Sequence, residues 1–396
     1  MRALSQRRTG KQNSPMIHIM PISQSPELEE KFVRFGVEFP NNFPYILPKF
    51  YQKEAALLRP DKNFFFKTGT FKGWVALDGA RVVGRIAAMI NPGMHLEKGV
   101  AGLVGLYEAA SDYEITRLLL DTAVAFLKEQ GCTYIWGPMA FSIWHGYRFK
   151  TDCWEDPPFV GEPQNPPYYP EFFEKYGFAL SDQWESNIVG RDGMRRLCDS
   201  HQEQYELFKK LGYQEETATT KNLMGICWEL VMETYKGFTG FSYLSQEELM
   251  TIYGAIPYLI ERKGSFFLKD PRGEYVGFIL VLNDLAAAVK AMKGKTGFFA
   301  KLRFKLNSHK YETASLYQGG IKFSAMREAL KTGRQAYHKP LSLGLVELYL
   351  TLREILKNNK CRYMLQPLMR SDAPNRNWAK ELSIKTMHYG MFELYP

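Results

Sequence analysis

Apolar positions along the first part of the chain recur with two different periods. Residues 26–39 and 115–130 each place apolar side chains on one face of a helix. Residues 74–88 contain two apolar runs joined by Asp78-Gly79, which is a strong signal for a hairpin. We expect a further helix at 43–58 and strands at 16–21, 102–108 and 134–139. This order predicts a mixed α/β layer.

An aromatic helix ends this first series of elements. Residues 168–176 are rich in Tyr and Phe, and Gly177 follows them. Glycine readily adopts the left-handed conformation that closes a helix. Phe178 then opens an apolar stretch, so we expect a helix, a capping glycine and a strand in succession.

After residue 189 a similar order of elements begins again. Residues 264–282 repeat the hairpin pattern, 313–321 predicts a strand and 341–358 a helix. The remaining expected elements are helices at 195–211, 222–235, 245–260 and 375–382 and strands at 362–368 and 386–394. Two copies of one layout explain a length of 396 residues. The sequence therefore predicts an α/β fold with a mixed α+β sheet in two tandem domains, 16–195 and 196–396, after a disordered basic tail at 1–15.

The composition is typical of a well-buried globular protein, with 45% hydrophobic and 14% aromatic residues. No apolar run reaches the roughly 18 residues that a membrane-spanning helix needs. The N-terminal residues lack the apolar segment of a secretory signal. The five cysteines are widely spaced and show no metal-binding or redox pattern. These features predict a cytoplasmic protein with reduced thiols and no metal.

The net charge of +9 suits an anionic partner, and it is concentrated at 290–310. This segment holds basic residues and no Asp or Glu, with apolar residues interleaved: Phe298, Phe299, Leu302, Phe304 and Leu306. One interpretation is a basic amphipathic element that binds anionic lipid or a lipidic substrate, peripheral to the inner face of the membrane. The other, slightly favoured, is a solvated helix whose apolar residues cover the core. Nucleic acid ranks last, because no reader motif accompanies the charge.

Several short segments occur in an order typical of one acyltransferase family. They are 83–88, 103–108, Gly137-Pro138 and 166–169 in the first half, and Gly277, Asn283-Asp284, 319–321 and 372–377 in the second. With these segments the chain resembles the bacterial tandem GNAT-like (GCN5-related) N-acyltransferases from about residue 16 onward. The resemblance implies acyl-CoA as co-substrate and transfer of its acyl group to a small-molecule amine or a lipidic amine. It implies no metal.

The two halves differ in charge where a CoA diphosphate would bind. Residues 108–114 carry three carboxylates and no basic residue, so this helix start repels anions. Lys339-x-x-Ser342-x-Gly344 has the spacing of the family's phosphate loop in a degenerate form. We therefore expect CoA in the second half, bound by Gly319, Gly320, Ile321, Arg334, Lys339, Ser342, Gly344 and Leu345. The alternative is a Pro-initiated helix with a small residue for packing.

The resemblance also supplies catalytic candidates. Glu108, at the end of a strand, is the candidate base acting through water, and an N-cap carboxylate is the alternative. Tyr169 is the candidate acid because Phe173 occupies the position of the family's phenol; a core aromatic is the alternative. Asn375, or alternatively Asn377, matches a helix-opening Asn of the family, and Tyr389 faces it in sequence order.

Two departures from the family pattern keep other functions open. Phe173 cannot donate a proton, and Tyr147 to Asp152 stands where the subgroup carries a glycine-rich acidic segment. The second departure predicts a reshaped substrate pocket. The alternatives to acyl-CoA transfer are a non-catalytic GNAT-like binding scaffold and an aminoacyl or peptidyl transferase.

Overall fold

The computed structural model of the protein describes residues 17–94, 96 and 99–396, and only the backbone of residues 374 and 375. The predicted tail at 1–15 lies outside the described residues. Below, residues 17–190 are called the first half and residues 191–396 the second half.

The elements of the first half follow the predicted order. They are β1 (Ile17–Pro21), α1 (Pro26–Glu38), α2 (Tyr51–Ala56), β2 (Thr70–Asp78), β3 (Arg81–Ile90), β4 (Ala101–Ala109), α3 (Tyr113–Glu129), β5 (Tyr134–Gly137), β6 (Phe149–Lys150), α4 (Tyr168–Tyr176) and β7 (Ala179–Gly190). The helix predicted at 43–58 is wrong before Tyr51, because Pro44 and Pro48 remove backbone donors and disfavour helix in the preceding residues. Gly177 caps α4 with a φ of 119°, which confirms the predicted helix end.

The second half repeats much of this order. Its elements are α5 (Arg191–Lys210), β8 (Gln214–Thr217), α6 (Leu223–Thr234), α7 (Gln246–Tyr253), β9 (Phe266–Lys269), β10 (Tyr275–Asn283), α8 (Ala286–Met292), α9 (Phe298–Asn307), β11 (Thr313–Ile321), α10 (Phe323–Tyr337), α11 (Leu343–Lys357), β12 (Tyr363–Arg370) and β13 (Ser383–Leu394). The helix predicted at 375–382 is wrong. Two 3₁₀ turns, Pro374–Trp378 and Lys380–Leu382, replace it, because so short a connection cannot propagate an α-helix.

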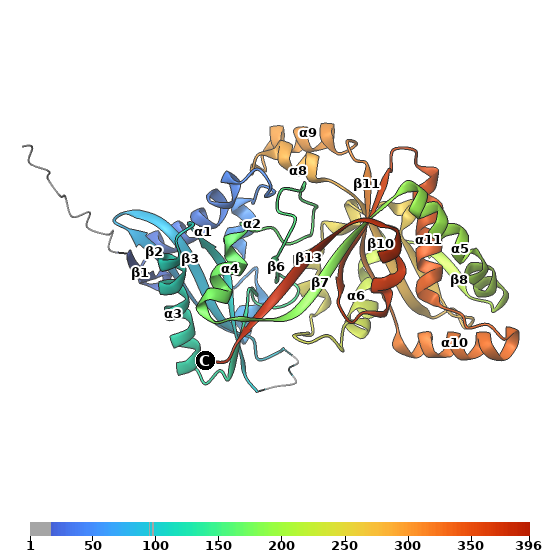
Figure 1. Cartoon of the computed structure of the whole chain (residues 1–396), viewed down its shortest axis with the longest axis horizontal. Coiled ribbons are helices and arrows are strands. Elements are labelled where there is room, and N and C mark those ends of the chain that lie inside the picture. Colours follow the sequence, from blue (N-terminus) through green and yellow to red (C-terminus); the bar gives the residue numbers. More distant parts are fainter. Residues whose placement is uncertain (1–16, 95, 97–98) are drawn as a thin grey trace, which may run out of the picture.

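All the strands named above belong to one sheet, and the last of them lies in its middle. The order across the sheet is β1-β2-β3-β4-β5-β13-β7-β12-β11-β10-β9-β8, with β6 paired to β13. β13 is antiparallel to β5 and to β7, and β7 in turn pairs with β12 of the second half. Figure 1 shows β7 and β13 crossing between the two halves. The mixed sheet confirms the predicted fold class, whereas the division at residue 195 stays a prediction.

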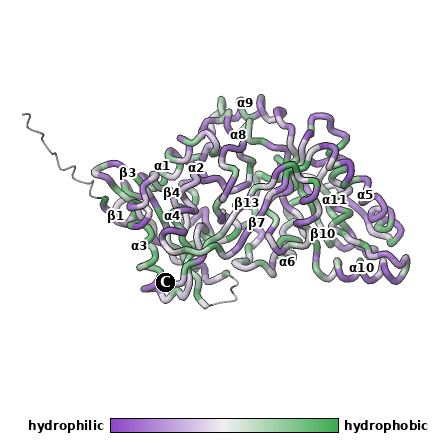
Figure 2. The backbone as a smooth tube through the Cα atoms, in the orientation of Figure 1, coloured by the Kyte–Doolittle hydropathy of each residue, from purple (hydrophilic) through white to green (hydrophobic). Residues whose placement is uncertain are grey.

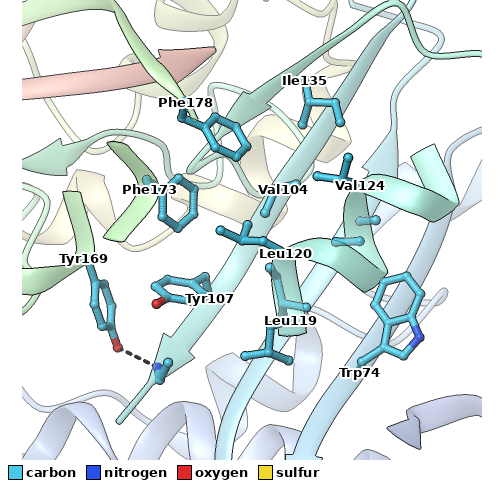
Figure 3. Close-up of a cluster of buried hydrophobic side chains, with 14 of the residues drawn as sticks. Trp74, Val104, Tyr107, Leu119, Leu120, Val124, Ile135, Tyr169, Phe173 and Phe178 are labelled. Carbon is cyan, nitrogen blue, oxygen red and sulfur yellow. Dashed lines mark hydrogen bonds between the residues drawn. The ribbon is translucent and has the colours of Figure 1, made fainter. Parts of the chain in front are cut away.

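Helix α3 covers one face of the first half's sheet. Its side chains Leu119, Leu120 and Val124 pack with Phe173 of α4 in a buried cluster (Figure 3). Figure 2 shows that the peripheral helices α5 and α10 are mainly hydrophilic. Within the described ranges, no helix combines the length and apolar character needed to cross a membrane.

Candidate active site

Each half contains a pair of parallel strands that separate after three residue pairs. In the first half the ladder of β4 and β5 ends at Leu103 and Trp136. In the second half the ladder of β11 and β12 ends at Ser315 and Leu365. Beyond these points the facing main-chain groups of the two strands are too far apart to bond each other, so each half has a potential site for an extended ligand.

The first half closes this gap with its own chain. The amide of Met139 donates to the Val104 carbonyl at 2.8 Å. A Cβ on Gly105 would lie 2.2 Å from the Met139 carbonyl oxygen, so the chain passes directly against β4 there. The following helix begins at Asp112, whose carboxylate accepts from the Glu114 amide at 2.9 Å. Within the described residues, the chain itself therefore closes the first-half gap at Val104 and Gly105.

The second half leaves the corresponding edge of β11 unpaired by β12. The Gly319 carbonyl accepts the hydroxyl of Tyr235 at 3.3 Å, so the main-chain groups of Gly319 point away from β10. Because these directions alternate along a strand, the main-chain groups of Ile321 face the gap as well. A Cβ on Gly320 would lie 2.6 Å from the Thr234 hydroxyl, so only glycine allows α6 this close.

The start of α11, where the sequence predicts the diphosphate, carries protein partners. The Ser342 amide donates to the Gln204 side chain at 2.8 Å, and a Cβ on Gly344 would lie 2.5 Å from the Trp378 ring. Lys339 pairs with Glu203 at 3.0 Å. The other predicted ligands differ in accessibility: Arg334 is exposed and Leu345 is half-buried. A diphosphate would have to displace the Gln204 side chain to reach this helix start.

Polar side chains from both halves meet beside the open edge of β11. We call them the junction cluster: Arg148, Glu162, Tyr235, Tyr317 and Tyr389. Tyr317 of β11 touches the loop that carries Glu162, since a Cβ on Gly161 would lie 3.2 Å from the Tyr317 ring. Tyr389 of β13 donates to Glu162 Oε2 at 2.9 Å. Tyr235 completes the cluster at the end of α6, and its ring centre lies 5.9 Å from that of Trp144.

Glu162 has the features of a general base. Burial raises the pKa of its carboxyl and outweighs the hydrogen bond from Tyr389 and the nearby positive charges of Lys150 and Arg148, which act in the opposite direction. Tyr389 holds Oε2, and Oε1 has no hydrogen-bond partner in the described structure. A carboxylate with a raised pKa and one free oxygen can accept a proton at neutral pH.

The predicted residues Glu108 and Tyr169 are brought together, but in the first half. Tyr169 donates to Glu108 Oε2 at 2.9 Å and accepts the Ala109 amide at 3.0 Å (Figure 3 shows the second bond). Glu108 also pairs with Lys49 and lies 3.8 Å from Arg85. Both residues are therefore held by protein partners.

A large distance separates this pair from the second-half gap. Strands β4 and β11 are five inter-strand steps apart, or about 24 Å at about 4.8 Å per step. Glu108 and Tyr169 therefore lie beyond the reach of a thioester bound along β11. Of the other two catalytic candidates, Tyr389 lies in the junction cluster, and the side chain of Asn375 is outside the described residues.

Comparison with solved structures places this geometry in a known fold. The tandem GNAT protein from the clavulanic acid biosynthesis pathway superposes with a TM-score of 0.51 at 12% identity, over 96% of this chain and 98% of that one. The chain has the tandem GNAT fold. This confirms the predicted resemblance at the level of structure, and no protein-family model matches the sequence.

Two curated proteins are similar in sequence to this tandem GNAT-like chain. The bacterial ceramide synthase of Caulobacter vibrioides is 24% identical over 322 residues, which is 77% of this chain and 80% of that protein. Protein YghO of Escherichia coli K12 is 22% identical over 296 residues, which is 72% of this chain and 73% of that protein.

Sequence reasoning missed Glu162, Arg148 and Tyr235 in this tandem GNAT-like protein. Glu162 lies in an irregular loop, where no periodicity marks a buried carboxylate. Arg148 belongs to the segment 147–152 that departs from the family pattern, and this departure was the one signal of an altered pocket. Tyr235 follows the last turn of a helix, where an aromatic residue indicates nothing by itself.

Proposed function

We propose that this tandem GNAT-like protein transfers an acyl group from acyl-CoA to the amine of a small-molecule or lipidic acceptor. The observation that carries the proposal is the open edge of β11 beside Glu162 and Tyr235. An extended pantetheine arm can bond such an edge as an added strand would. The similarity to a bacterial ceramide synthase supports an acyl donor and a long-chain amine as substrates.

Each group of the junction has a role in this reaction. The main-chain groups of Gly319 and Ile321 hold the pantetheine arm and the thioester beside them. Glu162 takes a proton from the incoming ammonium, and the amine nitrogen then attacks the thioester carbonyl to form a tetrahedral intermediate. As the C–S bond breaks, the hydroxyl of Tyr235 protonates the leaving thiolate. The second proton that the nitrogen loses on becoming an amide restores the Tyr235 hydroxyl, and the proton on Glu162 passes to solvent. Tyr389 holds Glu162 in place through its bond to Oε2.

The CoA diphosphate belongs, in this proposal, beside the α10–α11 loop. Arg334 and Lys339 are exposed there and bring positive charge. The predicted contacts with Ser342, Gly344 and Leu345 require the Gln204 side chain to leave the Ser342 amide. Amides at a helix start then bind the diphosphate.

We further propose that α9 places the protein on the inner face of an anionic membrane. Phe298 and Phe299 are 76% and 72% exposed, and only Ala300 of α9 is buried. The interpretation that the apolar residues of α9 cover the core is therefore wrong. Three basic residues follow these rings and alternate with Leu302, Phe304 and Leu306, as in helices that lie in a membrane interface. Figure 1 shows α9 at the outer rim of the molecule.

Vesicle binding tests this surface. The protein is expected to co-sediment with phosphatidylglycerol vesicles, and Phe298→Ser with Phe299→Ser to reduce the bound fraction several-fold because the inserted apolar area is lost. Tyr258→Ser is the control, since Tyr258 lies outside α9 and is 81% exposed. Equal binding of the two variants would exclude α9 as the docking element.

The acyl transfer itself is tested with purified protein, a series of acyl-CoA chain lengths and a panel of long-chain amines. We expect an amide product by mass spectrometry together with free CoA thiol. Glu162→Gln is the control, because it keeps the shape of the side chain and removes the base. CoA binding without product would support the scaffold alternative, and the absence of both binding and product would exclude the proposal.

A further inference from the structure

Arg148 carries a buried positive charge that the protein does not neutralise by contact. Its Nε and Nη1 atoms are shielded from solvent and have no hydrogen-bond partner among the described residues. Arg148 also forms no ion pair within the described part of the chain, although Glu162 is near enough to interact electrostatically. Burial lowers the pKa of its guanidinium, as expected for a cation removed from water.

Aromatic stacking explains the position of Arg148 but not its unused donors. The guanidinium carbon lies 3.8 Å from the centre of the Tyr147 ring and 4.6 Å from that of Trp184. Stacking engages the faces of the guanidinium, whereas its N–H groups point outward in the plane. Those donors remain available for a planar acceptor such as a carboxylate or a phosphate.

The backbone holds Arg148 in this place at a local cost. Its φ is 82°, in the left-handed region that residues with a Cβ avoid. Its amide donates to the Pro138 carbonyl at 3.1 Å, which fixes the turn against the end of β5. A strained backbone that presents an unpaired cation beside a candidate base is typical of a ligand-binding position.

The surroundings place this cation next to the reacting groups. Arg148 interacts electrostatically with Tyr235 and Tyr389, which contact Gly319 and Glu162 respectively. A ligand whose amine faces Glu162 therefore brings its neighbouring atoms toward Arg148. The side chain retains partial exposure, so it lies at the wall of the junction.

We propose that Arg148 binds an oxyanion carried by the acceptor, a carboxylate or a phosphate on the same molecule as the reacting amine. That the bound molecule is the acceptor rests on the proposed function, whereas the binding of an anion by Arg148 does not depend on it. It defines the acceptor class as amines with an adjacent acidic group, such as an amino acid or the phosphate ester of an amino alcohol. An amine without an acidic group lacks this contact.

Binding to the full-length protein without acyl-CoA tests the assignment. Calorimetry compares 2-aminooctane, 2-aminooctanoate and 2-aminooctyl phosphate, which share the hexyl chain and the amine-bearing carbon and differ in the group at C1. Wild type is expected to bind at least one anionic amine about 10- to 100-fold more tightly than 2-aminooctane, the effect of one charge-assisted hydrogen-bonded pair. Arg148→Gln is expected to lose this preference, and Arg148→Lys to keep part of it.

The results separate this inference from the proposed function. Equal affinity of wild type for all three ligands, or an unchanged preference in Arg148→Gln, would overturn the role of Arg148. The two anionic ligands decide between a carboxylate and a phosphate. If Arg148→Gln does not fold, the preference of wild type and its reduction in Arg148→Lys decide the question. Acyl transfer is measured separately with the preferred ligand, so its absence would count against the proposed function alone.

Discussion

Both gaps between parallel strands begin after three residue pairs, but the protein fills the first gap with its own chain and leaves the second open. In the first half, Met139 bonds across to β4 and the acidic groups nearby are paired with cations. At the second-half gap, the edge of β11 stays open. Arg148 and Glu162, which the first half contributes, and Glu347 of the second half form no ion pair in the described structure and have polar atoms without a hydrogen-bond partner there. Buried charges are normally paired. The contrast therefore separates a closed gap whose charges are paired from an open gap that can receive a ligand.

The largest expected effect lies at the open gap. Glu162→Gln should lower the rate of acyl transfer by about 10²–10⁴-fold, the contribution of a general base. Because burial raises the pKa of Glu162, the wild-type rate should increase as pH rises through that elevated value, and the variant should lose this increase. The rate of product formation, measured as a function of pH for wild type and variant, tests both the lower rate and the lost pH dependence. An unchanged rate in Glu162→Gln would show that another group is the general base.

Substitutions at the closed gap should change stability instead. Arg85→Met leaves Glu54 and Glu108 without their buried cation and should lower the free energy of unfolding by about 3–5 kcal/mol. Chemical denaturation measures the loss. Arg117→Met, which removes exposed pairs with Glu114 and Asp121, is the control and should cost less than about 1 kcal/mol. Similar losses in the two variants would show that the paired charges of the closed gap do not stabilise the fold.

Removing the charge of Glu347 should raise stability, whereas removing the charge of Arg85 should lower it. The Glu347 carboxyl lies buried on α11 and has no ionic partner among the residues that the structure describes, and burial raises its pKa well above the ordinary value. A raised carboxyl pKa means that the folded state holds the proton more tightly, so stability is lost as pH rises from the unfolded pKa toward the folded one. Glu347→Gln should therefore stabilise the protein by about 1–2 kcal/mol at neutral pH, and the gain should disappear in acid.

The control for Glu347 is on the same helix. Glu354→Gln removes an acid that already pairs with Lys357 and should change stability by less than about 1 kcal/mol. Thermal unfolding of both variants at acid and neutral pH gives the comparison. A destabilised Glu347→Gln at neutral pH would show that the carboxylate has a structural partner.

The smallest expected effect concerns the diphosphate. Gln204→Ala frees the Ser342 amide and should tighten CoA binding about 2- to 10-fold, because the ligand no longer competes for one hydrogen bond. Gln202→Ala, whose side chain bonds Glu206 on the exposed face of the same helix, should leave the affinity unchanged. If Gln204→Ala has no effect either, the diphosphate binds away from α11.

Local signals predicted much of the fold. The strand predicted at 313–321 has the same bounds as β11, and the hairpins and α3 occur within a few residues of their expected positions. These elements depend on periodicity and turn residues that lie next to each other in the sequence. The pairing of β13 with β5 and β7, and of β7 with β12, depends on which strand edges meet in space, and no local sequence pattern predicts it.

The site was less predictable than the fold. Glu108 and Tyr169 do meet, yet their full set of protein partners is invisible in the sequence. The sequence indicates Tyr389 only through its order in the chain, and its hydrogen-bond partner, Glu162, comes from a loop more than two hundred residues earlier. Such a site is formed by long-range contacts between irregular segments, and these contacts cannot be predicted from composition.

The central position of β13 has a consequence for synthesis on the ribosome. The first half has no neighbour for the free edge of β5 until a strand near the other end of the chain has emerged. Nascent first halves thus expose an unpaired edge for most of translation, which favours wrong partners and chaperone engagement. Productive folding of this protein is expected to be largely post-translational, with both halves becoming protease-resistant in a single step.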